Sequence, residues 1–433
     1  MMAVGFGFLS FCILFIGFYL FQFYGIGILN TLFIKLYTYI IYMSKSKKNI
    51  LYKSTNYTRK NTYKKENHVI KKFKNMLEKN PIERQYMTTM ITSIPKNNKF
   101  KNYPKTLNDL FKQLNDVLTV APEFNTSMLV GKPILKIIMW TMGSPEGFAA
   151  YKNDKINKMF GELLNEWKKF LDSPASRYVL NTSKKGWFSK EASKYIDLSE
   201  YQHDPSKPYN GFTSWNNFFT RKLVPGARPI DEPQNNNIIN SACESTIYRI
   251  SHNVQPNTSF WIKSQPYSIE AMLNADKKYV EKFTGGTIYQ AFLSPFNYHR
   301  WHSPINGTIE KAYVKKGVYF AQVNELGENP HYQRASEPYL TNIQTRALIF
   351  IKADNPKIGT VCFMPVGMVE IASCNINKNI KPGHRVKKGD ELGYFAYGGS
   401  THCLFFEPGV IKRFFHKKND FVKMGKKIAE VNE

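Results

Sequence analysis

The spacing of apolar residues changes near residue 210, and this change most restricts how the chain can fold. Before it, from about Leu107 to Leu171, apolar residues recur every three or four positions, as in LNDLFKQLNDVL and KMFGELLNEWKKFL, which predicts amphipathic helices. After it, short β-branched and aromatic runs alternate with turn residues, which predicts closely spaced strands. These runs are TIYRI, GGTIYQAFL, GTIEKAYV, RALIFIKA, GTVCFMPVGMVEIA and ELGYFAY. We therefore expect an α+β fold, in which a helical region precedes a mainly antiparallel, β-rich domain.

An apolar segment of 34 residues, Met1 to Ile34, contains no charged residue. A bilayer is spanned by about 20 apolar residues, and the segment lacks the basic start and short apolar core of a cleaved signal peptide. We expect residues 1–43 to form an N-terminal transmembrane helix, a single-pass membrane anchor. Basic residues follow this segment, which places the rest of the protein on the cytoplasmic side. An endomembrane and the mitochondrial inner membrane both remain open, and a buried core helix is the alternative.

The next segment, residues 44–80, is rich in Lys, Arg and Asn and is predicted to be a solvated basic linker. It could contact anionic lipid headgroups or act as a passive tether. The remaining chain divides into a helical N-terminal domain, residues 81–209, and a catalytic domain, residues 210–433.

The net charge of +27, from 60 Lys and Arg against 33 Asp and Glu, first suggests a polyanionic partner. Nine basic residues and no acid lie between Lys35 and Lys65, and the remaining excess is diffuse. No zinc-finger spacing or RNP-like string is present, so we expect no nucleic-acid partner. The cysteines form no CxxC pair, so we expect neither a metal site nor a disulfide framework. They are Cys12, Cys243, Cys362, Cys374 and Cys403.

Three clusters in the β-rich half carry candidate chemistry. Glu244 lies in SACESTI, His299 and His302 lie in NYHRWHSP, and Ser400 lies in YGGSTH. Taken singly, they are also compatible with a surface acid, structural histidines and a tight turn. Histidine exchanges protons near physiological pH, and the two glycines permit backbone angles that other residues resist. Acid, histidine and serine together are the parts needed to activate a serine hydroxyl through an imidazole.

These motifs resemble the phosphatidylserine decarboxylase family of pyruvoyl enzymes, over about Phe212 to Ile411. The matching segments are FTSWNNFFTR at Phe212–Arg221, PGARPID at Pro225–Asp231, YHRWHSP at Tyr298–Pro304, MPVGMV at Met364–Val369, KGDELGYF at Lys388–Phe395 and GGST at Gly398–Thr401. The preceding helical stretch and the string STHCL resemble a subgroup that includes fungal decarboxylases of aromatic amino acids.

The resemblance implies self-cleavage between Gly399 and Ser400. The Ser400 hydroxyl would attack the Gly399 carbonyl to form an ester, and elimination and hydrolysis would leave a pyruvoyl group at position 400. This group would replace pyridoxal phosphate as the cofactor, and the products would be a large chain, 1–399, and a small chain, 400–433. By similarity His302 is the base, and Glu244 occupies the position of the family's aspartate. His299 is the candidate acid that protonates the carbanion left by CO2.

The first functional hypothesis is conversion of phosphatidylserine to phosphatidylethanolamine and CO2, which the expected anchor favours. The first alternative is decarboxylation of a free, aromatic amino acid by the same residues. A serine hydrolase using Glu244, His302 and Ser400 is a second alternative, and a non-catalytic membrane-tethered scaffold is a third. The expected partners are therefore a phospholipid or amino-acid substrate, the membrane and the protein's own small chain. A homodimer is also compatible with the sequence.

Overall fold

The computed structural model describes residues 65–94, 103–127, 130–257, 267–321, 336–368, 370, 373–396 and 400–432. They belong to one structural unit, Lys64–Glu433, while the other unit, Met1–Tyr63, lies outside the described residues.

The N-terminal half of the described chain is helical because its apolar residues follow a helical period. In α8, Ile156, Phe160, Leu163 and Trp167 are buried, and the Asn153 side chain caps the first turn. The elements are α3 (His68–Glu78), α4 (Pro81–Thr92), α5 (Leu107–Val117), α6 (Pro133–Met142), α7 (Pro145–Lys152), α8 (Asp154–Asp172), η1 (Pro174–Val179), η2 (Ala192–Lys194), η3 (Leu198–Glu200), η4 (Pro208–Gly211) and α9 (Trp215–Phe219). The two helices predicted from LNDLFKQLNDVL and KMFGELLNEWKKFL are confirmed as α5 and α8.

Among the described residues, the C-terminal half contains three antiparallel sheets. The largest has the strand order β13-β2-β3-β11-β7-β6-β5-β9, and the others are β1-β14-β12 and β4-β10-β8. The elements are β1 (Ile238–Asn240), β2 (Ser245–Ser251), α10 (Ile269–Met272), α11 (Lys277–Phe283), β3 (Thr287–Leu293), β4 (Arg300–His302), β5 (Gly307–Lys315), α12 (Glu337–Ile343), β6 (Arg346–Ala353), β7 (Thr360–Gly367), β8 (Ser373–Ile376), β9 (Arg385–Val386), β10 (Glu391–Ala396), β11 (Ser400–Phe406), β12 (Ile411–Phe414), β13 (Phe421–Val422) and β14 (Lys427–Val431). The six predicted strand runs correspond to β2, β3, β5, β6, β7 and β10.

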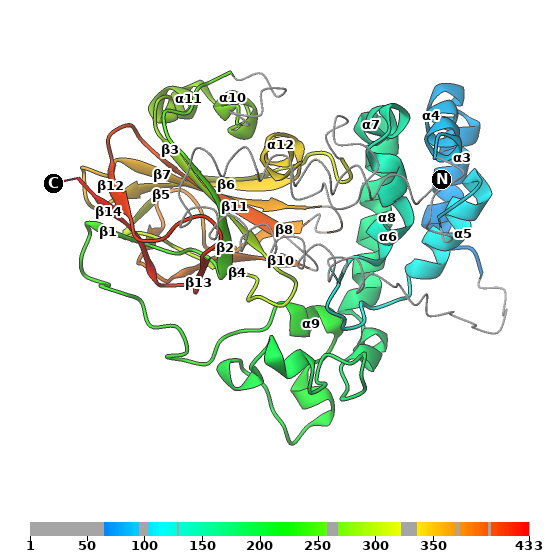
Figure 1. Ribbon diagram of the computed structural model, residues 1–433, viewed down its shortest axis with the longest axis horizontal. Helices are drawn as coiled ribbons and strands as arrows, with labels where there is room; N and C mark the ends of the chain where they lie inside the picture. The colour runs from blue at the N-terminus through cyan, green and yellow to red at the C-terminus, as the bar shows by residue number, and fades with distance from the viewer. Residues whose placement is uncertain are drawn as a thin grey trace, which may run out of the picture. The chain divides into compact units, whose positions relative to one another are not determined.

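The large sheet has a different apolar core on each face. Alternate residues of a strand point to opposite faces, so Leu404 enters one core with Trp301, while Cys403 enters the other with Phe283 of α11. Helices α10, α11 and α12 lie together along this second face, which is the upper side in Figure 1. A third core joins the helices of the N-terminal half to one another.

The predicted fold class and location need correction. In residues 65–432, gaps excluded, no helix is both long enough and apolar enough to cross a bilayer. The segment predicted to span the membrane, residues 1–43, lies outside the described residues. The described residues thus form a mixture of helices and antiparallel sheets with no membrane-spanning helix among them, and the predicted single-pass N-terminal anchor is not supported.

The helical region also begins earlier than predicted. Helix α3 lies inside residues 44–80, which were predicted to be a solvated linker. Its residues Val69, Ile70, Phe73 and Leu77 are buried and form one apolar face, while the lysines between them are exposed or only partly buried. The high density of lysines concealed this amphipathic pattern.

Candidate active site

Two of the predicted site residues, Glu244 and Ser400, lie at the same end of the large sheet. Strand pairing aligns Thr246 of β2 with Phe292 of β3, and Phe292 with Thr401 of β11. Glu244 precedes this row by two residues and Ser400 precedes it by one. The register therefore brings the segments that carry Glu244 and Ser400, which are more than 150 residues apart in sequence, to the same end of the sheet.

His302 ends β4 and is buried, with hydrogen bonds to both ring nitrogens. Its main-chain N–H donates to the Ala242 carbonyl at 2.9 Å, which places β4 beside the segment that carries Glu244. Its Nδ1 lies 2.7 Å from the Gly389 carbonyl oxygen, and its Nε2 lies 2.9 Å from the Tyr298 hydroxyl. Because a carbonyl only accepts, Nδ1 carries the proton and Nε2 accepts from Tyr298. Burial lowers the pKa of His302, so the ring is a neutral base.

Glu244 is buried just before β2, and its carboxylate pairs with Arg228. The same guanidinium contacts Glu200 of η3, with 2.6 Å between Nη2 and Oε2. Burial alone would lower the pKa of Arg228, but the hydrogen bonds to the two carboxylates raise it overall. The Glu244 carboxylate is thus paired with Arg228 and not with His302.

Ser400 is the first residue of β11 and is 2% exposed. It pairs with Leu293 on one side and with Gly367 on the other, so its backbone lies in the middle of the sheet. Its Oγ has no hydrogen-bond partner among the residues that the structure describes. Gly399, the other residue of the expected cleavage site, lies outside the described residues.

His299 is fully buried between the sheet and the helical region. Its ring stacks on Phe219 of α9 with 4.0 Å between ring centroids, and its carbonyl accepts from the Phe395 N–H at 2.9 Å. The side chains of Glu244, His302 and Ser400 are not hydrogen-bonded to one another in the described structure. The fold brings Glu244 and Ser400 to one end of the large sheet, and β4 with His302 beside the segment that carries Glu244, without hydrogen bonds that would assemble the expected triad.

Comparison with known proteins identifies the family. Two family models, both described as phosphatidylserine decarboxylase, match residues 67–196 and 215–430. The decarboxylase iboD of Amanita muscaria is 38% identical over 297 residues, covering 64% of this chain and 84% of that protein. The chain belongs to the phosphatidylserine decarboxylase family. The L-tryptophan decarboxylase of Psilocybe cubensis is 32% identical over 79% of this chain and 84% of its own length. A phosphatidylserine decarboxylase proenzyme of Clostridium perfringens is 33% identical over 64% and 85%.

Membership of the phosphatidylserine decarboxylase family makes this protein a carboxy-lyase of that type. The family is in general pyruvoyl-dependent. The resemblance inferred from the sequence motifs, including its fungal subgroup, is confirmed.

A buried acid near this end of the sheet, Glu370, was not predicted from the sequence. It follows β7 by three residues, and its Oε1 accepts from the main-chain N–H groups of Ile134 and Leu135 at the start of α6. Its Oε2 is buried and has no partner in the described part of the chain. Burial raises its pKa to about 8, although the two N–H donors and Lys132 oppose that rise. Its contact with α6 spans more than 230 residues, so local spacing could not reveal it.

His402 and Tyr298 were also missed. His402 lies two residues after Ser400 on the same face of β11, between the rings of Tyr289 and Phe363. Its two nitrogens have no partner among the described residues, and burial lowers its pKa to about 3. A histidine two residues from a serine suggests catalysis, yet here the ring is a neutral group in the apolar core. Tyr298 was visible within the YHRWH motif, but its role depends on contact geometry.

Proposed function

We propose that the protein is a pyruvoyl-dependent decarboxylase of a free amino acid, produced by self-cleavage between Gly399 and Ser400. The observation that carries this proposal is the Ser400 hydroxyl, which is buried at the start of β11 without a partner in the described residues and directly follows two glycines. A buried hydroxyl without a hydrogen bond is costly, and such groups need a structural or chemical reason. Conversion to a ketone removes this hydroxyl, so Ser400 fits the family's prosthetic group.

The choice of a free amino acid as substrate rests on how much of this chain each relative matches. The match to L-tryptophan decarboxylase extends over 383 residues and 79% of this chain, whereas the bacterial phosphatidylserine decarboxylase match covers 64%. Phosphatidylserine is the second candidate, because both family models carry that description.

In the proposed cleavage, the Ser400 Oγ attacks the carbonyl carbon of Gly399 and loses its proton to His302. The peptide bond becomes an ester, and elimination then releases the carboxylate of residue 399. Hydrolysis of the remaining group releases ammonia. The neutral Nε2 of His302 has the right protonation state for a base, but it now accepts from Tyr298. Tyr298 must therefore release Nε2, or pass the proton on, before His302 can act.

Once formed, the pyruvoyl ketone supplies an electron sink for the pair left on the substrate carbon when CO2 departs. The protein's own residues must then exclude water and return a proton to that carbon. His299 is buried against Phe219, and we assign the proton donation to it. The serine-hydrolase alternative receives no support from the relatives named above, which are all decarboxylases.

Intact-mass analysis of the purified protein tests the cleavage. We expect fragments 1–399 and 400–433, with the smaller one blocked to Edman sequencing, and a single uncut chain for Ser400→Ala. Ser245→Ala is the matched control, because Ser245 is also buried at the start of a strand of this sheet and its Oγ also lacks a described partner. The control should cleave normally, and an uncut wild-type chain would refute the proposal.

Assays of released CO2 test the substrate. Cleaved protein is incubated separately with L-tryptophan, other aromatic L-amino acids and phosphatidylserine in detergent micelles. Release from an amino acid but not from the lipid supports the proposal, and the opposite result supports the second candidate.

A further inference from the structure

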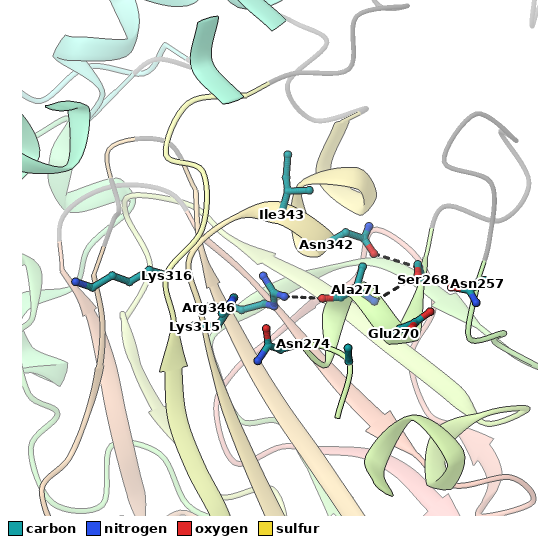
Figure 2. A pocket seen from close by; sticks show the side chains of 11 residues that line it. Asn257, Ser268, Glu270, Ala271, Asn274, Lys315, Lys316, Asn342, Ile343 and Arg346 are labelled. Carbon is teal, nitrogen blue, oxygen red and sulfur yellow. Dashed lines mark hydrogen bonds between the residues drawn. The ribbon is translucent and has the colours of Figure 1, made fainter. Parts of the chain in front are cut away.

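A cavity of about 500 Å³ opens on the helix-covered face of the large sheet. It lies between α10, the end of α12 and the adjacent ends of β5 and β6 (Figure 2). Its volume is in the range of small-molecule sites. The polar groups that line it include Ser268, Asn274 and Asn342, and the side chain of Asn342 accepts from the Ser268 N–H at 3.1 Å.

Arg346 places a buried positive charge in the wall of this cavity. The residue is 3% exposed and donates from Nε to the Met272 carbonyl at 2.7 Å, from Nη1 to Gln344 at 2.9 Å and from Nη2 to Ala271 at 2.6 Å. These bonds use three of its five N–H groups, and all three acceptors are uncharged carbonyls. Arg346 forms no ion pair with any carboxylate in the described residues. Burial lowers its pKa to about 10, so it remains charged at neutral pH.

Two further cations, Lys315 and Lys316, line the cavity and are exposed. Neither forms an ion pair within the described structure. Glu270 is the only acid among the lining residues. The lining thus carries a net charge of about +2, which matches a phosphate monoester with its charge of about −1.5 to −2 at neutral pH better than a singly charged carboxylate.

The cavity is separate from the proposed cleavage site. Arg346 pairs with Val366, and Val366 pairs with Thr401 on its other side, so Arg346 lies two strands, or about 10 Å, from Thr401. Directly opposed residues share a face of the sheet, whereas Ser400 and Thr401 point to opposite faces. The Ser400 side chain is therefore on the other face from Arg346.

We propose that this cavity is a second ligand site, which binds a small phosphate monoester through Arg346 and Lys315. Lys316, whose side chain extends away from Arg346 in Figure 2, adds positive charge at the rim. Nothing in the proposed decarboxylation requires such a site. Asn274, Asn342 and Ser268 make the lining polar, and the side chains of Asn342 and Ser268 are held in place by hydrogen bonds to main-chain groups. The source of the phosphate is a free ester or the headgroup of phosphatidic acid, and these share the same chemistry.

Isothermal titration of the full-length protein with sn-glycerol 3-phosphate, inorganic phosphate and glycerol tests the site. We expect saturable binding of the two phosphates and none of glycerol. The double variant Lys315→Ala/Lys316→Ala should bind about tenfold more weakly, and Glu270→Gln about threefold more tightly. All three side chains are exposed, so these changes should leave the fold intact. Lys352→Ala is the matched control, an exposed lysine at the far end of β6, and its affinity should equal that of the wild type.

Phosphatidylcholine vesicles with and without phosphatidic acid separate the two sources. Retention that requires phosphatidic acid and is lost in the double variant assigns the phosphate to a lipid headgroup. Binding of glycerol 3-phosphate without vesicle retention assigns it to a free ester. Absence of phosphate binding at millimolar concentration, or equal affinity in the wild type and the double lysine variant, would overturn the proposal.

Discussion

His302 shows how a single hydrogen bond sets the chemistry available to a residue. The Gly389 carbonyl fixes the proton on Nδ1, and the Tyr298 hydroxyl occupies the remaining lone pair on Nε2. A donor that binds the neutral ring stabilises it against protonation and so keeps its pKa low. Tyr298 is thus a positioning residue that controls when His302 is available to Ser400.

Replacing Tyr298 with Phe should therefore shift the pH dependence of self-cleavage upward. Loss of the hydrogen bond raises the pKa of His302, and the midpoint of the rate profile should move by about 0.5 to 1 pH unit. The measurement is the rate of appearance of the 400–433 chain between pH 4 and 9. Tyr289→Phe is the control, because the Tyr289 hydroxyl is buried without a described partner, and its profile should match the wild type. An unchanged midpoint in Tyr298→Phe would remove this role.

Glu370 should make the fold less stable as the pH rises. Its pKa is raised to about 8, above an ordinary value near 4.5, so its favourable contribution is complete below pH 4.5 and is lost as the pH passes through 8. Glu370→Gln retains an acceptor for the two N–H groups of α6 without ionising. In the uncleaved Ser400→Ala background, urea unfolding should show the Gln variant more stable by up to about 5 kcal/mol above pH 8 and equal at pH 4. A constant difference at both pH values would exclude ionisation as the cause.

At the scale of elements, Arg228 ties the η3 segment to the start of β2 by bridging two carboxylates. Arg228→Met should destabilise the protein by about 3 kcal/mol, because it leaves Glu244 charged, buried and unpaired. Adding Glu244→Gln should recover part of that loss, which a double-mutant cycle of urea unfolding measures. Lys423→Ala removes only the exposed pairing of Glu200 and should cost less than about 1 kcal/mol. If Glu244→Gln rescues nothing, the bridge is not what stabilises this junction.

The elements that could be predicted from sequence are those whose faces are set by local periodicity. Helix α8 and strand β6 follow the helical and extended patterns of their own residues, so their types and approximate ends were predicted correctly. Helix α3 was missed because lysines separate its buried residues. The positions of Ser400 and Glu244 at one edge depend on strand register, and register depends on pairing between distant segments. The pairing of Arg228 with Glu200 and Glu244 also depends on tertiary packing, so the spacing of these residues in the sequence could not predict it.

At the scale of the whole described unit, the helices of the N-terminal half and the β-rich half pack against each other. Tyr298, Phe320 and Ala396 belong to the apolar core of the helices although they lie in the β-rich half. Asn157 of α8 donates to the Gly317 carbonyl at 3.2 Å and accepts from the Tyr319 N–H at 3.0 Å. The change of apolar spacing near residue 210 therefore marks the change from helices to strands. It does not separate two cores, because residues on both sides of it pack together. The stacking of His299 on Phe219 of α9 is a further contact of this kind.

The interleaving of strands predicts that self-cleavage leaves the fold intact. The 400–433 chain would supply β11, which pairs with β3 and β7 in the interior of the large sheet, and every residue of β11 is buried. It would also supply β12, β13 and β14, of which β13 pairs with β2 and β14 with β1. Release of this chain would leave the backbone groups of β3 and β7 unpaired and open both apolar cores to water.

We therefore expect the two chains to elute together from a size-exclusion column in native buffer and to separate only in denaturant. Ser400→Ala provides the uncleaved reference, and its native elution volume should equal that of the cleaved wild type. Mass spectrometry of the native peak should find both chains in equal amounts. A 34-residue chain that elutes by itself without denaturant would show that the sheet does not retain β11 after cleavage.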